Sequence, residues 1–517
     1  MNNIVTRSLA AVIMIFAFTT ANSQEVIELK QPQSNKIIIK LMFRNGSISD
    51  PIGKEGLTNA TANLVVQGGT GSLTNRQIKE LLFPMAAGYG VSVDKEVTVF
   101  TFSVHKDFLN KFYPVLKDIM LTPSFTEEDL KRVKSNQQNY VDQVIRASSD
   151  EEYSKMALED LLFRGTNYQH MVQGTVPGVN AIILQDIKDH YKNYFTRNNL
   201  MVGIAGNYSP AFLQKLKLDM HMLSGAQPVL PKPAAAITPD GLQVEIISKP
   251  QALGSAIFTG VPLSITRADD DFAALMVANS YLGEHRNSKG QLYNKIRSVR
   301  SMNYGDYSYI EWYQSGGNNM LPEPGVPRSS NYFALWLRPV QIGEGLKKQY
   351  AELKDITIGH AQFALRLALG EIDNLIHDGM SAKAFNRTRD FLRSYIKLYI
   401  QTPDKQLGFL MDSRFYGRKD YIHDMDALLG KLTVEDVNKA IRKYWQVQNM
   451  FVTIVTDHTE AEPLAQALRN NQVSPMSYSN FVKEELPKDV LAEDENIAKY
   501  HLNIKSVKVV DTQNTFK

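Results

Sequence analysis

The 517-residue sequence contains no cysteine. Disulfides, thiolate metal ligands, a cysteine nucleophile and a lipid-modified cysteine are therefore excluded. No charge of one sign dominates either, because 57 Lys and Arg against 54 Asp and Glu leave a formal net charge of +3. No long basic run is present, so we expect no nucleic-acid partner. The sequence also lacks the G-x-S-x-G nucleophile elbow and the Walker phosphate loop.

Long apolar runs are absent except near the start of the chain. Leu9 to Phe18 (LAAVIMIFAF) follows Arg7 and precedes the small residues Ala21-Asn22-Ser23. This pattern is typical of a cleavable secretion signal, and we predict a signal peptide over residues 1–23 and a periplasmic or secreted mature protein. No later stretch approaches about 18 apolar residues, so we expect no membrane span after signal cleavage.

Length and composition predict more than one domain, since 43% of the 517 residues are hydrophobic. The strongest boundary is a proline-rich stretch that holds Pro228, Pro231, Pro233 and Pro239. The predicted organisation is an N-terminal domain over 24–223, a linker over 224–243, a C-terminal domain over 244–475 and a C-terminal extension over 476–517.

The two predicted domains repeat each other. Gln185 to Asn207 aligns without gaps with Glu435 to Asp457 at a constant offset of 250 residues, with aromatic residues in register. The domain openings also agree, because VIELKQPQ at Val26 resembles VEIISKPQ at Val244. Each half runs strands, helix, strands, helices, strand. We predict an α+β fold of two homologous domains, each with an antiparallel or mixed sheet and helices on one face. Two unrelated α+β domains are the alternative.

Gly56 to Gly71 (GLTNATANLVVQGGTG) reads as a helix that ends on a glycine-rich turn. It resembles the zinc-site helix of the pitrilysin/insulinase metallopeptidases, roughly G-L-A-H-F-L-E-H-M-L-F-K-G-T, which carries the inverted H-x-x-E-H motif. In this alignment the first His falls on Asn59, the Glu on Ala62 and the second His on Asn63. A neutral amide is a poor zinc ligand, and an alanine side chain cannot accept a proton.

The resemblance places the third zinc ligand, a Glu, near Tyr140, where the nearest carboxylate is Asp142. All four functional positions therefore depart from the family pattern. We expect no metal ligands in this chain. The resemblance implies that two such domains form one half of a clamshell, and that two halves enclose a chamber that takes in peptides. It therefore implies a second, homologous subunit that bears the zinc.

Leu292 to Trp312 (LYNKIRSVRSMNYGDYSYIEW) resembles a second family segment, roughly L-F-x-x-L-R-E-x-x-G-L-x-Y. Its Arg and Tyr, which reach across the chamber to the substrate and the transition state, match Arg297 and Tyr304. A guanidinium can bind a peptide carbonyl or carboxylate, and a phenol can donate to a developing oxyanion. Ser301 and Met302 replace the usual Gly-Leu. Three neighbours are weaker candidates: Arg300, Asp306 and Tyr307.

Two further segments stand out in the second predicted domain. Glu284-His285 looks like half of an H-x-x-E-H motif, with Tyr281 in place of the first His. We interpret it as a solvated loop pair. Gly316 to Ser330 (GGNNMLPEPGVPRSS) is rich in Gly and Pro and is predicted to be a flexible loop at the chamber rim.

These patterns favour a non-catalytic subunit that binds peptide and supplies Arg297 and Tyr304 to the active site of a zinc-bearing partner. One alternative is a peptide-binding or scaffold protein without a peptidase role. Another is an active zinc endopeptidase with an atypical site. Bound zinc and peptide cleavage, measured on the chain alone and with its partner, separate the three.

Overall fold

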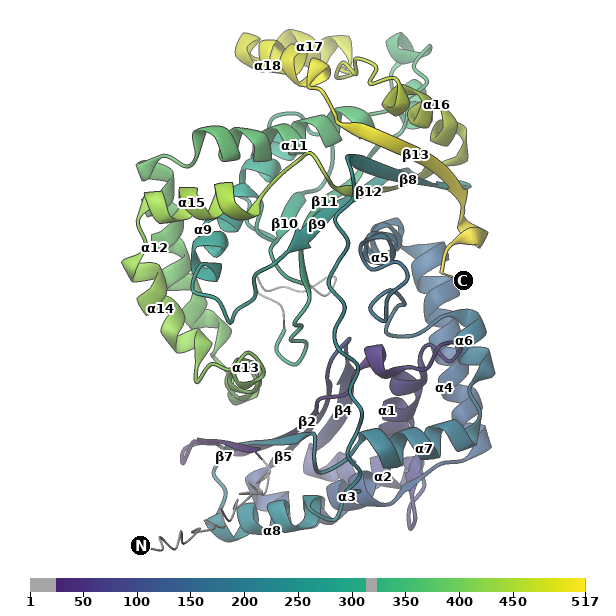
Figure 1. Cartoon of the computed structure of the whole chain (residues 1–517), viewed down its shortest axis with the longest axis vertical. Helices are drawn as coiled ribbons and strands as arrows, with labels where there is room; N and C mark the ends of the chain where they lie inside the picture. Colours follow the sequence, from purple (N-terminus) through teal and green to yellow (C-terminus); the bar gives the residue numbers. More distant parts are fainter. Residues whose placement is uncertain (1–24, 313–322, 517) are drawn as a thin grey trace, which may run out of the picture.

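Two β-sheets divide the chain into two halves, as the computed structural model in Figure 1 shows. The structure describes residues 25–312 and 323–516. The predicted signal peptide and residues 313–322 lie outside this part. The predicted α+β fold with two sheet-containing domains is confirmed. Within the described residues, no helix combines the length and the apolar character that crossing a bilayer demands.

The first half holds a five-stranded mixed sheet in the order β1-β7-β2-β5-β4 and a short two-stranded pair, β3 and β6. The strands are β1 (Glu25–Lys30), β2 (Lys36–Phe43), β3 (Gly69–Thr70), β4 (Gly88–Val93), β5 (Thr98–His105), β6 (Pro123–Ser124) and β7 (Leu200–Gly206). The longer helices are α1 (Leu57–Gln67), α2 (Asn75–Leu82), α3 (Leu109–Leu121), α4 (Glu127–Asn139), the π-helix η4 (Tyr140–Ser148), α5 (Asp150–Leu162), α6 (Val176–Ala181), α7 (Leu184–Tyr194) and α8 (Pro210–Met220).

The second half holds a six-stranded sheet in the order β10-β11-β9-β12-β8-β13. The strands are β8 (Leu242–Lys249), β9 (Gly254–Leu263), β10 (Asp306–Tyr309), β11 (Asn331–Gln341), β12 (Phe451–Asp457) and β13 (Ile504–Asp511). The longer helices are α9 (Phe272–Leu282), the π-helix η5 (Tyr293–Ser298), α10 (Gly343–Gln349), α11 (Ala361–Asp378), α12 (Ala382–Tyr399), α13 (Pro403–Phe415), α14 (Tyr421–Lys431), α15 (Val434–Tyr444), α16 (His458–Arg469), α17 (Asn480–Glu485) and α18 (Lys488–Lys499).

The strand order is the same in both sheets, which confirms that the domains are homologous. Read from β1, the first sheet runs β1-β7-β2-β5-β4, and the second runs β8-β12-β9-β11-β10. The register agrees as well. Val26 pairs with Val202 across β1 and β7, and Val244 pairs with Val452 across β8 and β12. The second sheet adds one strand, β13, which lies parallel to β8 at the edge.

Helices cover both faces of each sheet, and on one face the covering helix comes from the other half of the chain. Figure 1 shows α5 of the first half beside the second sheet, where it packs on β9 and β12. In return α13 of the second half packs on β1, β2 and β7. Two strand glycines face these helices: an added Cβ at Gly260 would meet Leu158, and one at Gly203 would meet Met411 and Leu407. The halves are therefore joined by an exchange of helices.

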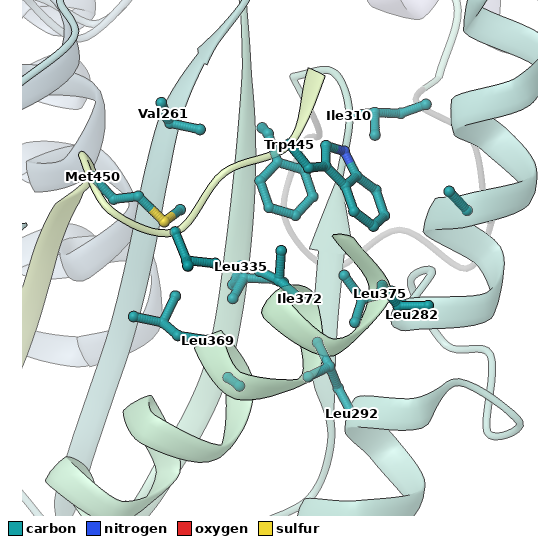
Figure 2. Close-up of a cluster of buried hydrophobic side chains, with 14 of the residues drawn as sticks. Val261, Leu282, Leu292, Ile310, Leu335, Leu369, Ile372, Leu375, Trp445 and Met450 are labelled. Carbon is teal, nitrogen blue, oxygen red and sulfur yellow. The ribbon is translucent and has the colours of Figure 1, made fainter. Parts of the chain in front are cut away.

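The largest core lies in the second half, between the sheet and its own helices (Figure 2). Val261 of β9, Leu335 of β11 and Ile372 of α11 are buried together in this cluster. Leu282 at the end of α9 and Trp445 after α15 are buried in the same cluster. Helix α9 is buried in this layer, and the segment with Arg297 and Tyr304 follows α9 along the chain.

A buried ionic network joins the halves beside the exchanged helices. Arg328 contacts Asp94 at 2.7 Å and Glu159 at 2.9 Å, and Lys95 contacts Glu159 at 2.8 Å. Burial alone would raise the pKa of Glu159, but the charges of Lys95 and Arg328 lower it to about 2. Arg328 is only 3% exposed, so this end of the Gly316–Ser330 segment is packed, contrary to the expectation of a flexible loop.

Gly203→Ala tests whether the close approach of α13 to β7 stabilises the contact between the two halves. The added Cβ would lie 2.5 Å from Met411 Sδ and 3.1 Å from a Leu407 methyl. We expect such overpacking to lower the free energy of unfolding by about 1–3 kcal/mol in chemical denaturation. Gly345→Ala on α10 is the matched control, because its nearest neighbour is 3.9 Å away. An equal loss of stability in both variants would argue against the close packing.

Candidate functional site

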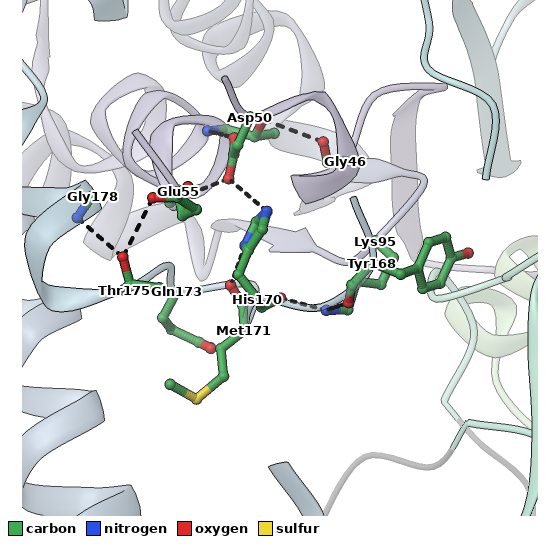
Figure 3. A network of polar contacts seen from close by, with 12 residues as sticks. Gly46, Asp50, Glu55, Lys95, Tyr168, His170, Met171, Gln173, Thr175 and Gly178 are labelled. Carbon is green, nitrogen blue, oxygen red and sulfur yellow. Dashed lines mark hydrogen bonds and ion pairs between the residues drawn. The ribbon is translucent and has the colours of Figure 1, made fainter. Parts of the chain in front are cut away.

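The helix that resembles the family's zinc helix, α1, begins on a glycine that no other residue type can easily replace. Gly56 has φ 102°, and a Cβ there would lie 2.7 Å from the Gln173 carbonyl. The Asp50 carboxylate accepts the backbone N–H groups of Gly56 and Thr58, each at 2.7 Å, and so caps the helix. Burial raises the pKa of Asp50, although the nearby His170 opposes the shift. Figure 3 shows Asp50, His170 and Glu55 meeting at this end of α1.

Two other segments fix the start of α1. The Gln137 amide on α4 donates to the Gly56 carbonyl at 3.1 Å and to the Gln173 carbonyl at 2.8 Å. In the loop after α5, Thr175 lies between Glu55 and the N–H of Gly178 (Figure 3). The motif positions of α1 are therefore held in one defined place, even though they carry no metal ligands.

The positions that align with the family's His ligands carry amides, which form hydrogen bonds along one face of α1. Asn63 Nδ2 donates to Asn59 Oδ1 at 2.9 Å, and Gln67 Nε2 donates to Asn63 Oδ1 at 2.9 Å. Arg132 of α4 then donates to Gln67 Oε1 at 3.1 Å. Ala62 is fully buried in the hydrophobic core of the first half. One hydrogen bond therefore links the amides at the two His positions, and Gln67 supplies the donor to Asn63 Oδ1.

These residues do not fit a zinc ion. A zinc site uses three or four His, Cys or carboxylate ligands, and a hydrolytic site also needs a base for the bound water. Within residues 25–312 and 323–516, no group of three or more such side chains could hold a metal ion. Asp142, the carboxylate nearest the third position, is in an ion pair with Arg146 at 2.8 Å. We derive no step through a metal bound to this chain.

Arg297 and Tyr304 lie in contact with each other in the second half. Arg297 belongs to the π-helix η5, and its Nη1 donates to the Tyr304 carbonyl at 2.6 Å. Its guanidinium carbon lies 5.4 Å from the ring centre of Tyr293 and 5.2 Å from that of Tyr304. Tyr304 is 75% exposed. Arg297 thus stacks with two phenols in a cation–aromatic arrangement, and Tyr304 is its exposed member.

The three weaker candidates are buried. Arg300 is in ion pairs with Glu493 and Asp494 of α18. Asp306 accepts from Asn303 at 2.7 Å, and burial raises the pKa of Asp306 well above its ordinary value. Tyr307 is only 6% exposed. All three are packed inside the domain, so we assign them structural positions.

The interpretation of Glu284-His285 as a solvated loop pair is wrong. Glu284 is 3% exposed and His285 is 2% exposed. His285 Nδ1 lies 2.8 Å from the Tyr309 hydroxyl, and the ring stacks on Trp336 at 5.9 Å. A tertiary contact explains why these two polar residues are buried. The carbonyl of Gly283 accepts the N–H of Ser308 at 2.6 Å, which places the turn after α9 against β10.

Glu284→Gln tests this burial through pH. Burial raises the pKa of Glu284 to about 7, against hydrogen bonds from Ser280 and Asn287 that lower it. Because the folded pKa exceeds the ordinary value of 4.5, wild type loses stability as the pH rises from 4.5 to about 7. The variant lacks this titration and should not lose that stability. Its free energy of unfolding relative to wild type should therefore be up to about 3 kcal/mol higher at pH 8 than at pH 4. Urea unfolding at both pH values measures this difference. The exposed Glu495→Gln is the control, and parallel profiles for wild type and Glu284→Gln would contradict the burial.

Several residues at the site were not found from the sequence. Gln67 lies four residues after Asn63, so its place on the same helix face was detectable from spacing. Tyr293 lies four residues before Arg297, within the segment that resembles the family, so its place beside Arg297 was also detectable from spacing. Arg132 was not, because it reaches the site by tertiary packing and stands in no motif.

The fold is a duplicated α+β fold, and amides stand at the positions that align with the zinc ligands of the peptidases. These two features together define a relative of such peptidases that lacks their ligand side chains. Residues 25–176 match the insulinase family (peptidase family M16), and residues 181–392 match the peptidase M16 inactive domain. The chain belongs to the insulinase family. Its resemblance to that family, predicted from the sequence, is confirmed.

Two relatives carry different names. The chain is 26% identical to the "non-peptidase homolog YmxG" of Helicobacter pylori over 58% of this chain and 69% of the relative. It is 22% identical to the "uncharacterized zinc protease YmxG" of Bacillus subtilis over 59% of this chain and 72% of the relative. The family therefore includes relatives named as peptidases and relatives named as non-peptidases.

Solved structures show the same fold. A peptidase M16 inactive domain from Pseudomonas fluorescens superposes with a TM-score of 0.71 at 18% identity, over 85% of this chain and 96% of the other. A Helicobacter pylori protease superposes with a TM-score of 0.68 at 13% identity, over 84% and 97%. At these identities the likeness concerns the fold alone.

Proposed function

We propose that this chain is a non-catalytic peptidase subunit that binds peptide and supplies Arg297 and Tyr304 to the zinc site of a homologous partner. The observation that carries the proposal is a contrast between two sites. The helix that should hold the metal is closed by hydrogen bonds among Asn59, Asn63 and Gln67. The Arg297–Tyr304 stack is open to solvent.

The edge strand β4 supports a peptide-binding role. In the part of the chain that the structure describes, β4 pairs only with β5, so its outer edge keeps backbone N–H and C=O groups available. An extended peptide can add to such an edge as a further strand. The degenerate helix α1 packs beside β4, so a peptide there would pass Asn59 and Asn63 without meeting a metal.

Arg297 and Tyr304 are suited to act on a substrate held elsewhere. Within the described residues the Arg297 side chain makes one hydrogen bond and no ion pair, so most of its guanidinium N–H groups stay available. The exposed Tyr304 hydroxyl can donate a hydrogen bond to an oxyanion that forms when water attacks a peptide carbonyl. The partner would bind the zinc and provide the base. With the predicted signal peptide removed, the pair would work in the periplasm or outside the cell.

The test compares peptide cleavage by three preparations. These are the chain alone, a secreted homologue from the same source that has an intact H-x-x-E-H helix, and the two together. We expect the pair to cleave a peptide library faster than the homologue alone, and we expect no cleavage by the chain alone. Chelator-sensitive cleavage by the chain alone would overturn the proposal. Peptide binding by the chain with no gain in cleavage by the pair would instead favour a binding or scaffold role.

A further inference from the structure

We propose that the C-terminal helix α18 is a positioning element that holds Arg297 and Tyr304 in their exposed stack. The proposal rests on the proposed function, in which these two side chains act on the substrate. It assigns a role to Glu493 and Asp494, which lie far from Arg297 in the sequence and do not contact it.

Glu493 and Asp494 clamp the two cations on either side of Arg297. Lys295 Nζ lies 2.6 Å from Glu493 Oε1 and 2.6 Å from Glu371 Oε1. Arg300 Nη2 lies 2.6 Å from Glu493 Oε2, and Arg300 Nε lies 2.7 Å from Asp494 Oδ1. The Glu493 carboxylate therefore bridges both cations. Such short charge-assisted hydrogen bonds fix direction as well as distance.

The ion pairs from Glu493 and Asp494 flank a stretch of backbone with an unusual conformation. Residues 293–298 form a π-helix, and the N–H of Val299 bonds to the Asn294 carbonyl five residues back. Ser301 follows with φ 53°, a left-handed conformation that non-glycine residues rarely adopt. Arg300 Nη1 also donates to the Lys295 carbonyl at 2.9 Å, which closes the π-helical turn from within. Contacts from α18 can therefore stabilise a rare type of turn that depends on the structure around it.

Burial makes the clamp effective. The Arg300 side chain is 0% exposed and that of Asp494 is 8% exposed, so water does not compete for their contact. Tyr478 also donates to Asp494 Oδ2 at 2.8 Å, which fixes the carboxylate. Removing one partner of a buried charge pair leaves the other charge unsatisfied, so the turn must rearrange when the clamp is lost.

Arg297 lies between the two clamped residues, so the clamp fixes where its guanidinium points. A fixed η5 turn places that guanidinium between the rings of Tyr293 and Tyr304 and against the Tyr304 carbonyl. Groups that act on a transition state need such preorganisation, because small misplacements reduce the rate strongly. Without α18 the stack would sample several orientations.

The first measurement reads the stack directly, with no partner and no substrate. Fluorotyrosine is incorporated in place of Tyr304, and its fluorine NMR resonance is recorded in wild type and in Arg297→Ala. We expect the Glu493→Gln/Asp494→Asn double variant to move the resonance toward its position in Arg297→Ala. Glu495→Gln, on the exposed side of the same helix, is the matched control and should leave it unchanged. Circular dichroism checks that each variant is folded.

The second measurement is cleavage by the complete pair. We expect the double variant to lower kcat roughly ten- to a hundredfold with little change in KM. Combined with Arg297→Ala, it should cause no further loss, because both changes disable the same group. If the double variant does not fold, Glu493→Gln alone carries the same test, since that carboxylate is 37% exposed.

The outcomes separate the two proposals. An unchanged fluorine resonance in the folded α18 variants would overturn the positioning role, whatever the cleavage assay shows. Losses that multiply with that of Arg297→Ala would also overturn it, since they would come from another route. A shifted resonance in the α18 variants, together with full cleavage by a pair that carries Arg297→Ala, would keep the positioning role and reject the proposed function of Arg297.

Discussion

Replacing Arg297 with Ala and Tyr304 with Phe together is expected to lower kcat/KM of the peptidase pair by about a hundred- to a thousandfold. Removing donors aimed at a developing oxyanion has costs of this size. The loss should fall mainly on kcat, because the negative charge that these groups stabilise forms only in the transition state. Initial rates on a quenched fluorescent peptide, measured over a range of substrate concentrations with saturating partner, separate kcat from KM.

The two single variants should show that the residues act as a unit. Arg297 stacks on Tyr304 and donates to its carbonyl, so losing either one disturbs the other, and the single losses should not add. Arg442→Ala is the control, because this Arg is 45% exposed and paired only with Glu435 in the described residues. Wild-type rates in the Arg297→Ala/Tyr304→Phe pair would remove these residues from the active site.

Arg328→Ala is expected to cause the largest loss of stability, about 3–5 kcal/mol in the free energy of unfolding. The change removes the guanidinium that pairs with both Asp94 and Glu159. Both carboxylates are buried, so neither can recover its hydration. Trp312 lies 3.9 Å from the Arg328 guanidinium, so tryptophan fluorescence in a urea titration reports the transition.

Acid should reveal the same network. Glu159 has a folded pKa of about 2, below its ordinary value of 4.5. A lowered pKa gives stability that is present above pH 4.5 and is lost as the pH falls toward 2. We expect wild type to lose this contribution in acid and Arg328→Ala to lose less of it. Arg442→Ala, an exposed pair, should change stability by less than about 0.5 kcal/mol. A similar small loss in Arg328→Ala would contradict the importance of the network.

The duplicated fold could be predicted because its evidence is local. The helix, turn and strand of residues 185–207 recur at 435–457, and the strand register that pairs Val26 with Val202 recurs with Val244 and Val452. The exchange of α5 and α13 could not be predicted. It depends on which sheet face remains free and on Gly203 and Gly260 letting a helix approach. Neither property is visible in hydrophobic periodicity.

The candidate site could likewise be predicted only in part from the sequence. Asn59 and Asn63 are four residues apart, so spacing alone placed them on one face of a helix. That they bond to each other could be learned only from the structure. For Glu284 and His285 the local sequence was misleading. Polar residues after a helix are typical of a loop, but the hydrogen bond between Ser308 and Gly283 places them under β10.

Zinc bound to the isolated chain tests the central claim most directly. The purified protein is incubated with zinc, passed through a desalting column and analysed by atomic absorption, with the H-x-x-E-H homologue treated in parallel. We expect the homologue to retain one zinc ion per chain and this chain to retain far less, because Asn59, Ala62 and Asn63 offer it no ligands. One tightly held zinc ion per chain, lost on Asn59→Ala/Asn63→Ala substitution, would contradict the account.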